Sequence, residues 1–340
     1  MQIFDYQQRA FYYQQEKKHQ LKDLSRVSNA AGLSGLLFFI FSFIAAFIAI
    51  LAAAMLNSHY SSEAVEQFCI NLDYILGTLI PLPVTFFIFA KINKMRVRDS
   101  LPLEFKNKNN IMLTIGMAFA LIMISRLIVA LFSVVLNFFN YDVSAPELAE
   151  PNGIGETIVL ATVVTLMTGL IEEFAYRGIM LTALRKYGDT FAVIASSFIF
   201  SIMHRNPISI LNAFLLGVIM GYAVIITNSL WTSIIIHTLN NFQSIIYLIF
   251  PENTALILIL VISGVMAAIG ITAVIIVAIY RKDIKSHIHL NKNRLLPLGN
   301  KIIRFYFAPM VLILIAVICF FDPIEYWIAQ FIRGLVSVIL

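Results

Sequence analysis

The sequence predicts an all-α fold, a polytopic transmembrane helical bundle of about nine spans, with eight to ten allowed by the hydropathy pattern. Of the 340 residues, 60% are hydrophobic and only 13% are charged, and the mean hydropathy is +0.86. Ordinary soluble domains do not show this composition. Apolar segments of roughly 20 residues, the length that crosses a bilayer, recur along the chain. The basic residues fall between these segments, where they set membrane topology.

Residues 1–33 are predicted to form a cytoplasmic N-terminal segment, because they are polar and carry a cluster of positive charge. The basic residues are Arg9, Lys17, Lys18, Lys22 and Arg26. A solvated tail that sets the topology is the interpretation that we favour, and a helix lying on the membrane surface is the alternative.

Residues 34–153 are predicted to hold the first transmembrane helices. Three spans are expected, at about 34–56, 70–90 and 111–139. Pro81 and Pro83 are expected to kink the second span. The loop after this span is rich in lysine and arginine, which places it inside the cell.

Residues 154–250 are predicted to form the core of the bundle. Its four spans are expected at about 154–187, 190–205, 208–227 and 230–250. Gly188 is a helix stop between the first two, and Pro207 disfavours helix in the residue before it. Gly217 and Gly221 lie four residues apart, which indicates close packing of helices.

Residues 251–340 are predicted to hold the C-terminal transmembrane helices and a tail. Two spans are expected at about 254–280 and 306–321, and the apolar tail at 324–340 suits an interfacial or re-entrant helix. The basic stretch 281–304 is expected to be cytoplasmic. With nine spans, every strongly basic loop lies on the cytoplasmic side.

Charge and cysteine content exclude two further classes of function. The net charge is +5, but the basic residues are topology determinants, so no nucleic-acid partner is expected. The cysteines, Cys69 and Cys319, lack the spacing of a metal site, and nothing supports a disulfide between them. Two charged residues outside the core, Asp73 and Arg126, lie in apolar runs and are interpreted as polar contacts between helices or as residues near span ends.

The segment Leu170–Gly178 places two carboxylates and an arginine in a predicted membrane span. A charged side chain in hydrocarbon costs a few kcal/mol or more, so such residues are usually functional. At 100° per residue, Glu173 and Arg177 lie about 40° apart on one helix face, whereas Glu172 points about 100° away from Glu173. Glu173 is therefore predicted to pair with Arg177. Glu172 remains as a lone carboxylate suited to act as a general base.

Histidines follow on the next spans. Gly188 lies sixteen residues after Glu172 and sixteen before His204, so a helical hairpin that turns there would place these two side chains at equal depth. Phe200, one turn before His204, is expected to pack against its ring. His237 and Asn241 are four residues apart and share a helix face. Four polar groups are thus predicted to converge on one cavity: Glu172, His204, His237 and Asn241.

A carboxylate, two imidazoles and an amide suffice to hydrolyse an acyl bond without a cofactor. Glu172 would take a proton from the attacking water, and histidine or asparagine donors would stabilise the oxyanion. The HExxH pattern of helix-borne zinc proteases is absent. Two histidines and a glutamate also suit catalytic zinc, so a zinc site formed by Glu172, His204 and His237 stays open as an alternative.

These motifs resemble those of a known family. Glu172-Glu173-x-x-x-Arg177, Phe200-x-x-x-His204 and His237-x-x-x-Asn241 occur in the order seen in the CPBP intramembrane proteases, which include the CAAX prenyl protease type 2 enzymes and the bacterial Abi proteins. Residues 214–217 and 227–231 are similar to the linking segment of the family. The resemblance covers about residues 154–245 and implies that Glu172 is the base and that Glu173 and Arg177 are its paired neighbours. It also implies that the histidine and asparagine site residues are His204, His237 and Asn241.

The resemblance implies an intramembrane endopeptidase that acts on a peptide or membrane-protein substrate in the lipid bilayer. Residue usage and the lack of a targeting signal favour a bacterial plasma membrane, with a multi-pass chain whose N-terminus is cytoplasmic. Candidate substrates there are a peptide pheromone, a bacteriocin or a signalling protein. The alternative is a non-enzymatic membrane scaffold or bacteriocin-immunity protein that binds a partner membrane protein. A transporter is disfavoured because inverted repeats are not visible.

Overall fold

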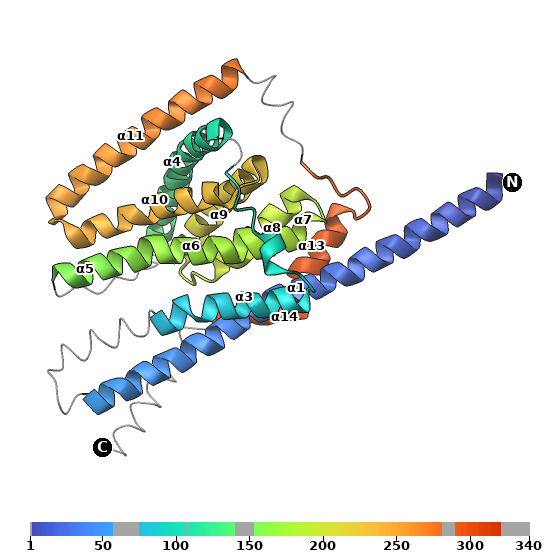
Figure 1. Cartoon of the computed structure of the whole chain (residues 1–340), viewed down its shortest axis with the longest axis horizontal. Helices are drawn as coiled ribbons and strands as arrows, with labels where there is room; N and C mark the ends of the chain where they lie inside the picture. Colours follow the sequence, from blue (N-terminus) through green and yellow to red (C-terminus); the bar gives the residue numbers. More distant parts are fainter. Residues whose placement is uncertain (1, 57–74, 106–107, 140–152, 281–289, 321–340) are drawn as a thin grey trace.

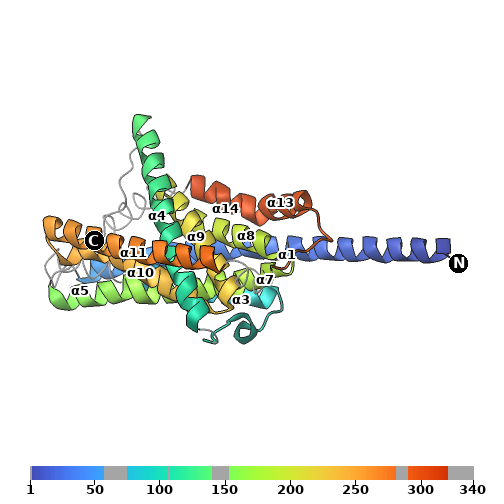
Figure 2. The ribbon, with the colours of Figure 1, turned by 90° about the horizontal axis from the view of Figure 1, so that it is seen from above.

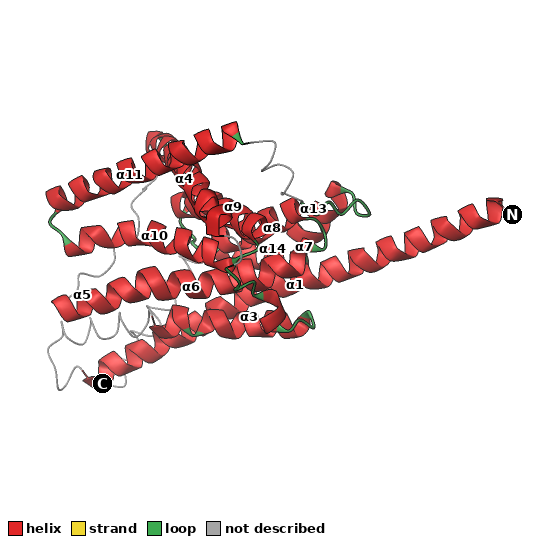
Figure 3. Ribbon diagram, turned by 45° about the horizontal axis from the view of Figure 1, so that its top comes forward, coloured by secondary structure: helices red, strands yellow, loops and turns green. Residues whose placement is uncertain are grey.

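In a computed structural model of the chain, the residues described are 2–56, 75–105, 108–139, 153–280 and 290–320. All regular structure within them is helical and they contain no strand (Figure 3). The predicted all-α class is therefore confirmed. The predicted C-terminal tail, together with Cys69 and Asp73, lies outside the described residues.

Helix α1 (Gln2–Leu56) forms one side of the bundle with α3 (Pro81–Ile92), α13 (Leu298–Tyr306) and α14 (Pro309–Cys319). The predicted N-terminal segment and first span are one continuous helix of 55 residues, and its N-terminal part projects beyond the other helices (Figures 1 and 2). Gly32 allows α1 and α14 to touch, because a Cβ atom there would lie 2.3 Å from the backbone of Met310.

The central element is a long helix from Ile154 to Arg185 with two π-helical stretches. Its parts are α5 (Ile154–Ala161), η3 (Thr162–Met167), α6 (Thr168–Glu173), η4 (Phe174–Met180) and α7 (Leu181–Arg185). Gly188 follows with a φ of +112°, a conformation that glycine adopts at little cost. The chain then returns through α8 (Asp189–Ile202), which is the hairpin that the sequence predicts.

The remaining helices pack on the other side of the central helix (Figure 1). They are α4 (Lys108–Phe138), α9 (Pro207–Thr227), α10 (Leu230–Ile249) and α11 (Glu252–Ile279). Asn206 caps α9 by accepting a hydrogen bond from the backbone of Ile208 at 3.0 Å, and Pro207 occupies the first helical position, where no backbone donor is needed.

The predicted nine spans are not confirmed. Five helices among the described residues are long and apolar enough to cross a membrane, and a sixth is counted if α13 and α14, bent by 56°, form one span. The five are Gln8–Ala49, Lys108–Phe138, Thr157–Arg185, Pro207–Thr227 and Glu252–Ile279.

The other predicted spans fall on short or polar helices. Helices α3 and α8 have 12 and 14 residues, which corresponds to about 20 Å of helix, whereas the hydrocarbon core is about 30 Å thick. Helix α10 has 20 residues, but its C-terminal half is interrupted by three amide side chains. These are Asn240, Asn241 and Gln243.

The regions before and after the core are tied to it at the Gly188 turn. Asp23 of α1 pairs with Lys186 and accepts a hydrogen bond from the Tyr187 hydroxyl at 2.9 Å. On the other side, the backbone N–H of Asn291 donates to Asp189 Oδ2 at 2.8 Å. Segments that lie far apart in the sequence thus hold the hairpin between α7 and α8.

Candidate active site

Glu173 and Arg177 form the ion pair that their spacing predicts. Glu173 is the last residue of α6 and Arg177 lies in η4, and Arg177 Nη1 donates to Glu173 Oε1 at 2.8 Å. Their side chains are 0% and 1% exposed. Each charge is thus compensated by its partner, which a buried charge requires.

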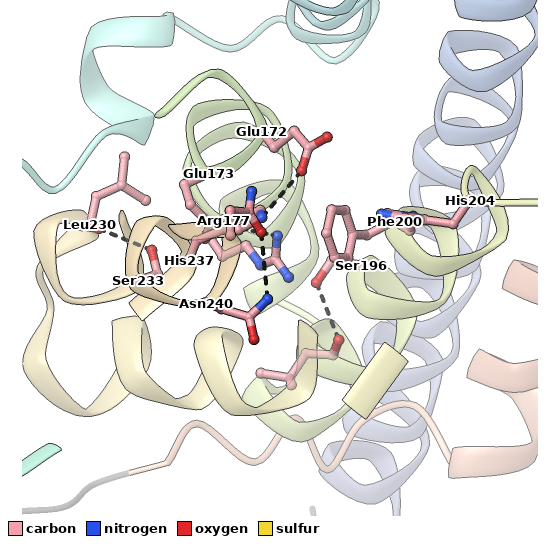
Figure 4. A network of polar contacts seen from close by, with 12 residues as sticks. Glu172, Glu173, Arg177, Ser196, Phe200, His204, Leu230, Ser233, His237 and Asn240 are labelled. Atoms are coloured by element: carbon pink, nitrogen blue, oxygen red, sulfur yellow. Dashed lines mark hydrogen bonds and ion pairs between the residues drawn. The ribbon is translucent and has the colours of Figure 1, made fainter. Parts of the chain in front are cut away.

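His237 of α10 joins the two glutamates. Its Nδ1 lies 2.8 Å from Glu173 Oε1, and its Nε2 lies 3.5 Å from Glu172 Oε2 (Figure 4). Because an ionised carboxylate only accepts hydrogen bonds, the proton on Nδ1 is donated to Glu173. Glu172, unlike Glu173, keeps an accessible side chain, with 16% of it exposed.

Phe200 of α8 is the apolar centre of the site. The Arg177 guanidinium carbon lies 4.2 Å from the centroid of its ring, a cation–π contact. The rings of His204 and His237 lie 5.0 Å and 6.0 Å from the same centroid. The predicted packing of Phe200 against His204 is therefore present, and one aromatic ring contacts both imidazoles.

His204 lies in the turn that follows the C-terminal end of α8. Its side chain is exposed, and Nδ1 donates to the Phe200 carbonyl oxygen at 3.1 Å. Since a carbonyl can only accept, Nε2 is the nitrogen left for another partner. Arg205, which has a φ of 61°, and Asn206 then lead into α9.

Asn241 does not meet the other predicted site residues directly. Its amide Nδ2 donates to the carbonyl oxygen of Val164 at 3.3 Å. Val164 lies in η3, where the π-helical turn changes the usual backbone pairing. Among the contacts of the described residues, none joins Asn241 to Glu172, His204 or His237. The predicted convergence therefore holds for Glu172 and His237, and for His204 through Phe200.

Tyr176 is a residue of the site that the sequence reasoning missed. Its side chain is 4% exposed, and its ring packs edge-on against Phe86 of α3 at 4.9 Å and Phe200 at 5.0 Å. The available signal was its position four residues after Glu172, on the same helix face. Tyr176 connects the α1–α3 side of the bundle to the site.

Arg126 makes the interhelical contacts that were predicted for it. It donates from α4 to the side-chain oxygen of Gln243 on α10 and, at 3.5 Å, to Ser263 on α11. These contacts join three helices within the apolar region of the bundle.

The alternative zinc ligands are not arranged as a metal site. In the described part of the chain, no three His, Cys, Asp or Glu side chains are grouped so that they could hold a metal ion. The Phe200 ring contacts both His204 and His237. His237 already donates to Glu173 through Nδ1. Nε2 is thus the nitrogen of His237 that remains for a metal ion, and the zinc alternative stays a prediction.

Comparison with known proteins assigns the region that carries these residues. Residues 154–243 match the family model described as type II CAAX prenyl endopeptidase Rce1-like. No match is found among curated proteins or solved structures. The matched region runs from the start of α5 into α10 and includes all six predicted site residues. Residues 154–243 are therefore an Rce1-like domain of the CAAX protease family, carried by a chain of apolar helices.

Proposed function

We propose that the protein is an intramembrane endopeptidase that hydrolyses a peptide bond with a water molecule activated by Glu172. The difference between the two glutamates carries this proposal. Glu173 is fully buried, and one of its oxygens accepts hydrogen bonds from both Arg177 and His237. Glu172 keeps an accessible carboxylate 3.5 Å from His237 Nε2. Only Glu172 is thus available to take a proton from water.

The reaction begins when Glu172 accepts a proton from water as the water oxygen attacks the scissile carbonyl carbon. Negative charge then develops on the carbonyl oxygen, and donors must stabilise it. Glu173 accepts the hydrogen bond from His237 Nδ1 and so stabilises positive charge on the imidazole, as a carboxylate does in a catalytic triad. When both of its ring nitrogens carry a proton, His237 donates to the oxyanion from Nε2. Glu172 returns its proton to the leaving amine, so the hydroxyl and the hydrogen of water end on the two products.

The other two motif residues have supporting roles in this proposal. His204 Nε2 is directed away from its bonded Phe200 carbonyl and can orient the attacking water. The Asn241 amide has two N–H groups, and one remains for the oxyanion when the other binds Val164.

The proposed substrate is a peptide or membrane-protein segment that reaches the site within the bilayer. Glu172 and Glu173 lie inside Thr157–Arg185, a helix long and apolar enough to cross a membrane. A site at this position favours substrates that are themselves apolar, whether by sequence or by a lipid group. The cell membrane, with the N-terminus in the cytoplasm, is the proposed location.

Mass spectrometry of membrane and secreted peptides tests the proposal in cells that lack the endogenous copy. Wild type, Glu172→Gln and His204→Ala are compared at matched expression. Glu252→Gln, a change at an exposed position in the first turn of α11, is the control. A precursor that accumulates in both site variants, but not in the control, would support proteolysis. If both site variants rescue a deletion phenotype and leave all peptides unchanged, the protein acts by binding a partner.

A further inference from the structure

The Arg177 guanidinium is held on three sides. Nη1 donates to Glu173 Oε1 at 2.8 Å, and the guanidinium carbon lies over the Phe200 ring at 4.2 Å. Nη2 faces Gly217 of α9, because a Cβ atom built on this glycine would lie 3.1 Å from Nη2. A side chain at position 217 would therefore crowd Arg177 Nη2, which would have to move by a few tenths of an ångström.

Ser197 of α8 also lies close to position 217. The Cβ atom of an alanine at position 217 would lie 3.0 Å from both Cβ and Oγ of Ser197. The Ser197 hydroxyl and Arg177 Nη2 are buried, and neither has a hydrogen-bond partner among the described residues. Contacts of this length are tighter than nine in ten real Cβ contacts. A methyl group at position 217 must therefore displace Arg177 or Ser197.

We propose that Gly217 is a positioning residue, because its lack of a side chain leaves the space that fixes Arg177 and, through Glu173, orients His237. This inference rests on the function proposed for the site. The contacts are continuous, because Arg177 Nη1 and His237 Nδ1 donate to the same oxygen of Glu173. A displaced guanidinium changes the position or the charge of that oxygen. The orientation of the His237 imidazole, which bonds to this oxygen and lies beside Glu172, then changes as well.

Gly221 provides a matched control for Gly217. It lies one turn later on α9, is also buried and also faces α8. A Cβ atom there would lie 3.0 Å from Val193 Cγ1. Gly221→Ala therefore crowds the α8–α9 contact to a similar degree without approaching Arg177.

The test compares purified full-length wild type, Gly217→Ala and Gly221→Ala by NMR and by peptidase kinetics. In protein labelled with ¹⁵N-histidine, His237→Ala identifies the Nδ1–H signal of His237. Gly217→Ala should shift this signal and lower kcat with little change in KM, because the neighbours of the added methyl group must move by a few tenths of an ångström. The loss should not exceed about 100-fold, the effect of a displacement of about 1 Å. Gly221→Ala should change neither. Equal losses in both variants, or a wild-type signal and kcat in Gly217→Ala, would overturn the proposal.

A double variant separates the position of Arg177 from the spacing of the helices. Ser197→Gly removes the α8 atoms that the added methyl group meets, so Gly217→Ala with Ser197→Gly retains only the Arg177 contact. The altered His237 signal should persist in this protein, and its recovery would overturn the proposal. The double variant also supplies the test if Gly217→Ala alone does not fold.

The NMR measurement does not depend on turnover. A wild-type protein without Glu172-dependent proteolysis would overturn the proposed function. The His237 signal would still decide whether Gly217 fixes the position of Arg177.

Discussion

His237 and Glu173 share a hydrogen bond of 2.8 Å that joins α10 to the central helix. Arg177 donates to the same Glu173 oxygen, also at 2.8 Å. The orientation of the imidazole therefore depends on a buried ion pair rather than on His237 alone. In the proposed mechanism, Glu173 is therefore a positioning residue and Glu172 is the base.

Glu173→Gln should lower both stability and activity. The change removes the negative charge and leaves Arg177 buried without a counter-ion, a loss typically of about 3–5 kcal/mol. Thermal denaturation in detergent and kcat measure the two effects. Glu172→Gln is the matched control, because Glu172 is partly exposed. It should abolish turnover with a Tm near wild type, and an active, folded Glu172→Gln protein would refute the assignment of the base.

Asn241→Ala should lower kcat by about 100-fold, the typical loss when one oxyanion donor is removed. Asn240→Ala is the control, since Asn240 is the adjacent residue, carries the same amide group and donates to Asn241 at 3.5 Å. It should keep kcat near wild type. The Tm of each variant shows whether the lost bond to Val164 contributes to the effect. Equal kcat losses in the two variants would exclude a specific role for Asn241.

Contacts within one helix could be predicted because local geometry fixes them. Glu173 and Arg177 are four residues apart in the central helix and meet whenever it forms. Phe200 and His204 are also four residues apart, and their rings meet at the turn that directly follows α8. The turn at Gly188 could be predicted for a similar reason, since its positive φ suits glycine.

Contacts between helices depend on packing that the pattern does not show. Asn241 shares a face with His237, yet its amide binds Val164 at a π-helical turn that no sequence signal indicates. The nine predicted spans are not confirmed among the described residues for a related reason. Short helices such as α8 are apolar because other helices of the protein surround them. Composition alone does not distinguish a helix buried in protein from a helix buried in lipid.

Metal removal should leave the peptidase active. The proposed mechanism uses a glutamate-activated water, and the candidate ligands Glu172, His204 and His237 are not grouped as a metal site. Protein treated with a chelator and shown to be metal-free by elemental analysis should retain the kcat of untreated protein. Loss of activity that returns when zinc is added would instead establish the zinc mechanism.

Tyr187→Phe should destabilise the protein more than Lys186→Met, although both residues bind Asp23. Tyr187 is 1% exposed and donates to Asp23 at 2.9 Å, a partly buried bond of a kind that typically contributes about 1 kcal/mol. The Lys186 side chain is 51% exposed, so solvent screens its ion pair and little stability is expected from it. Thermal unfolding in detergent compares the variants, and a larger loss in Lys186→Met would contradict the ranking.

The same tyrosine predicts a dependence of stability on pH. Burial, and then the hydrogen bond to Asp23, raise the pKa of Tyr187 above its ordinary value of 10.0. The folded protein therefore keeps this proton above about pH 10, where the unfolded chain releases it. The stabilisation is fully present below that pH and is lost as the pH rises further. Wild type should lose more stability than Tyr187→Phe between about pH 9 and 11, since phenylalanine has no proton to release. Parallel curves of stability against pH would show that Tyr187 ionises as freely in the folded state as in the unfolded chain.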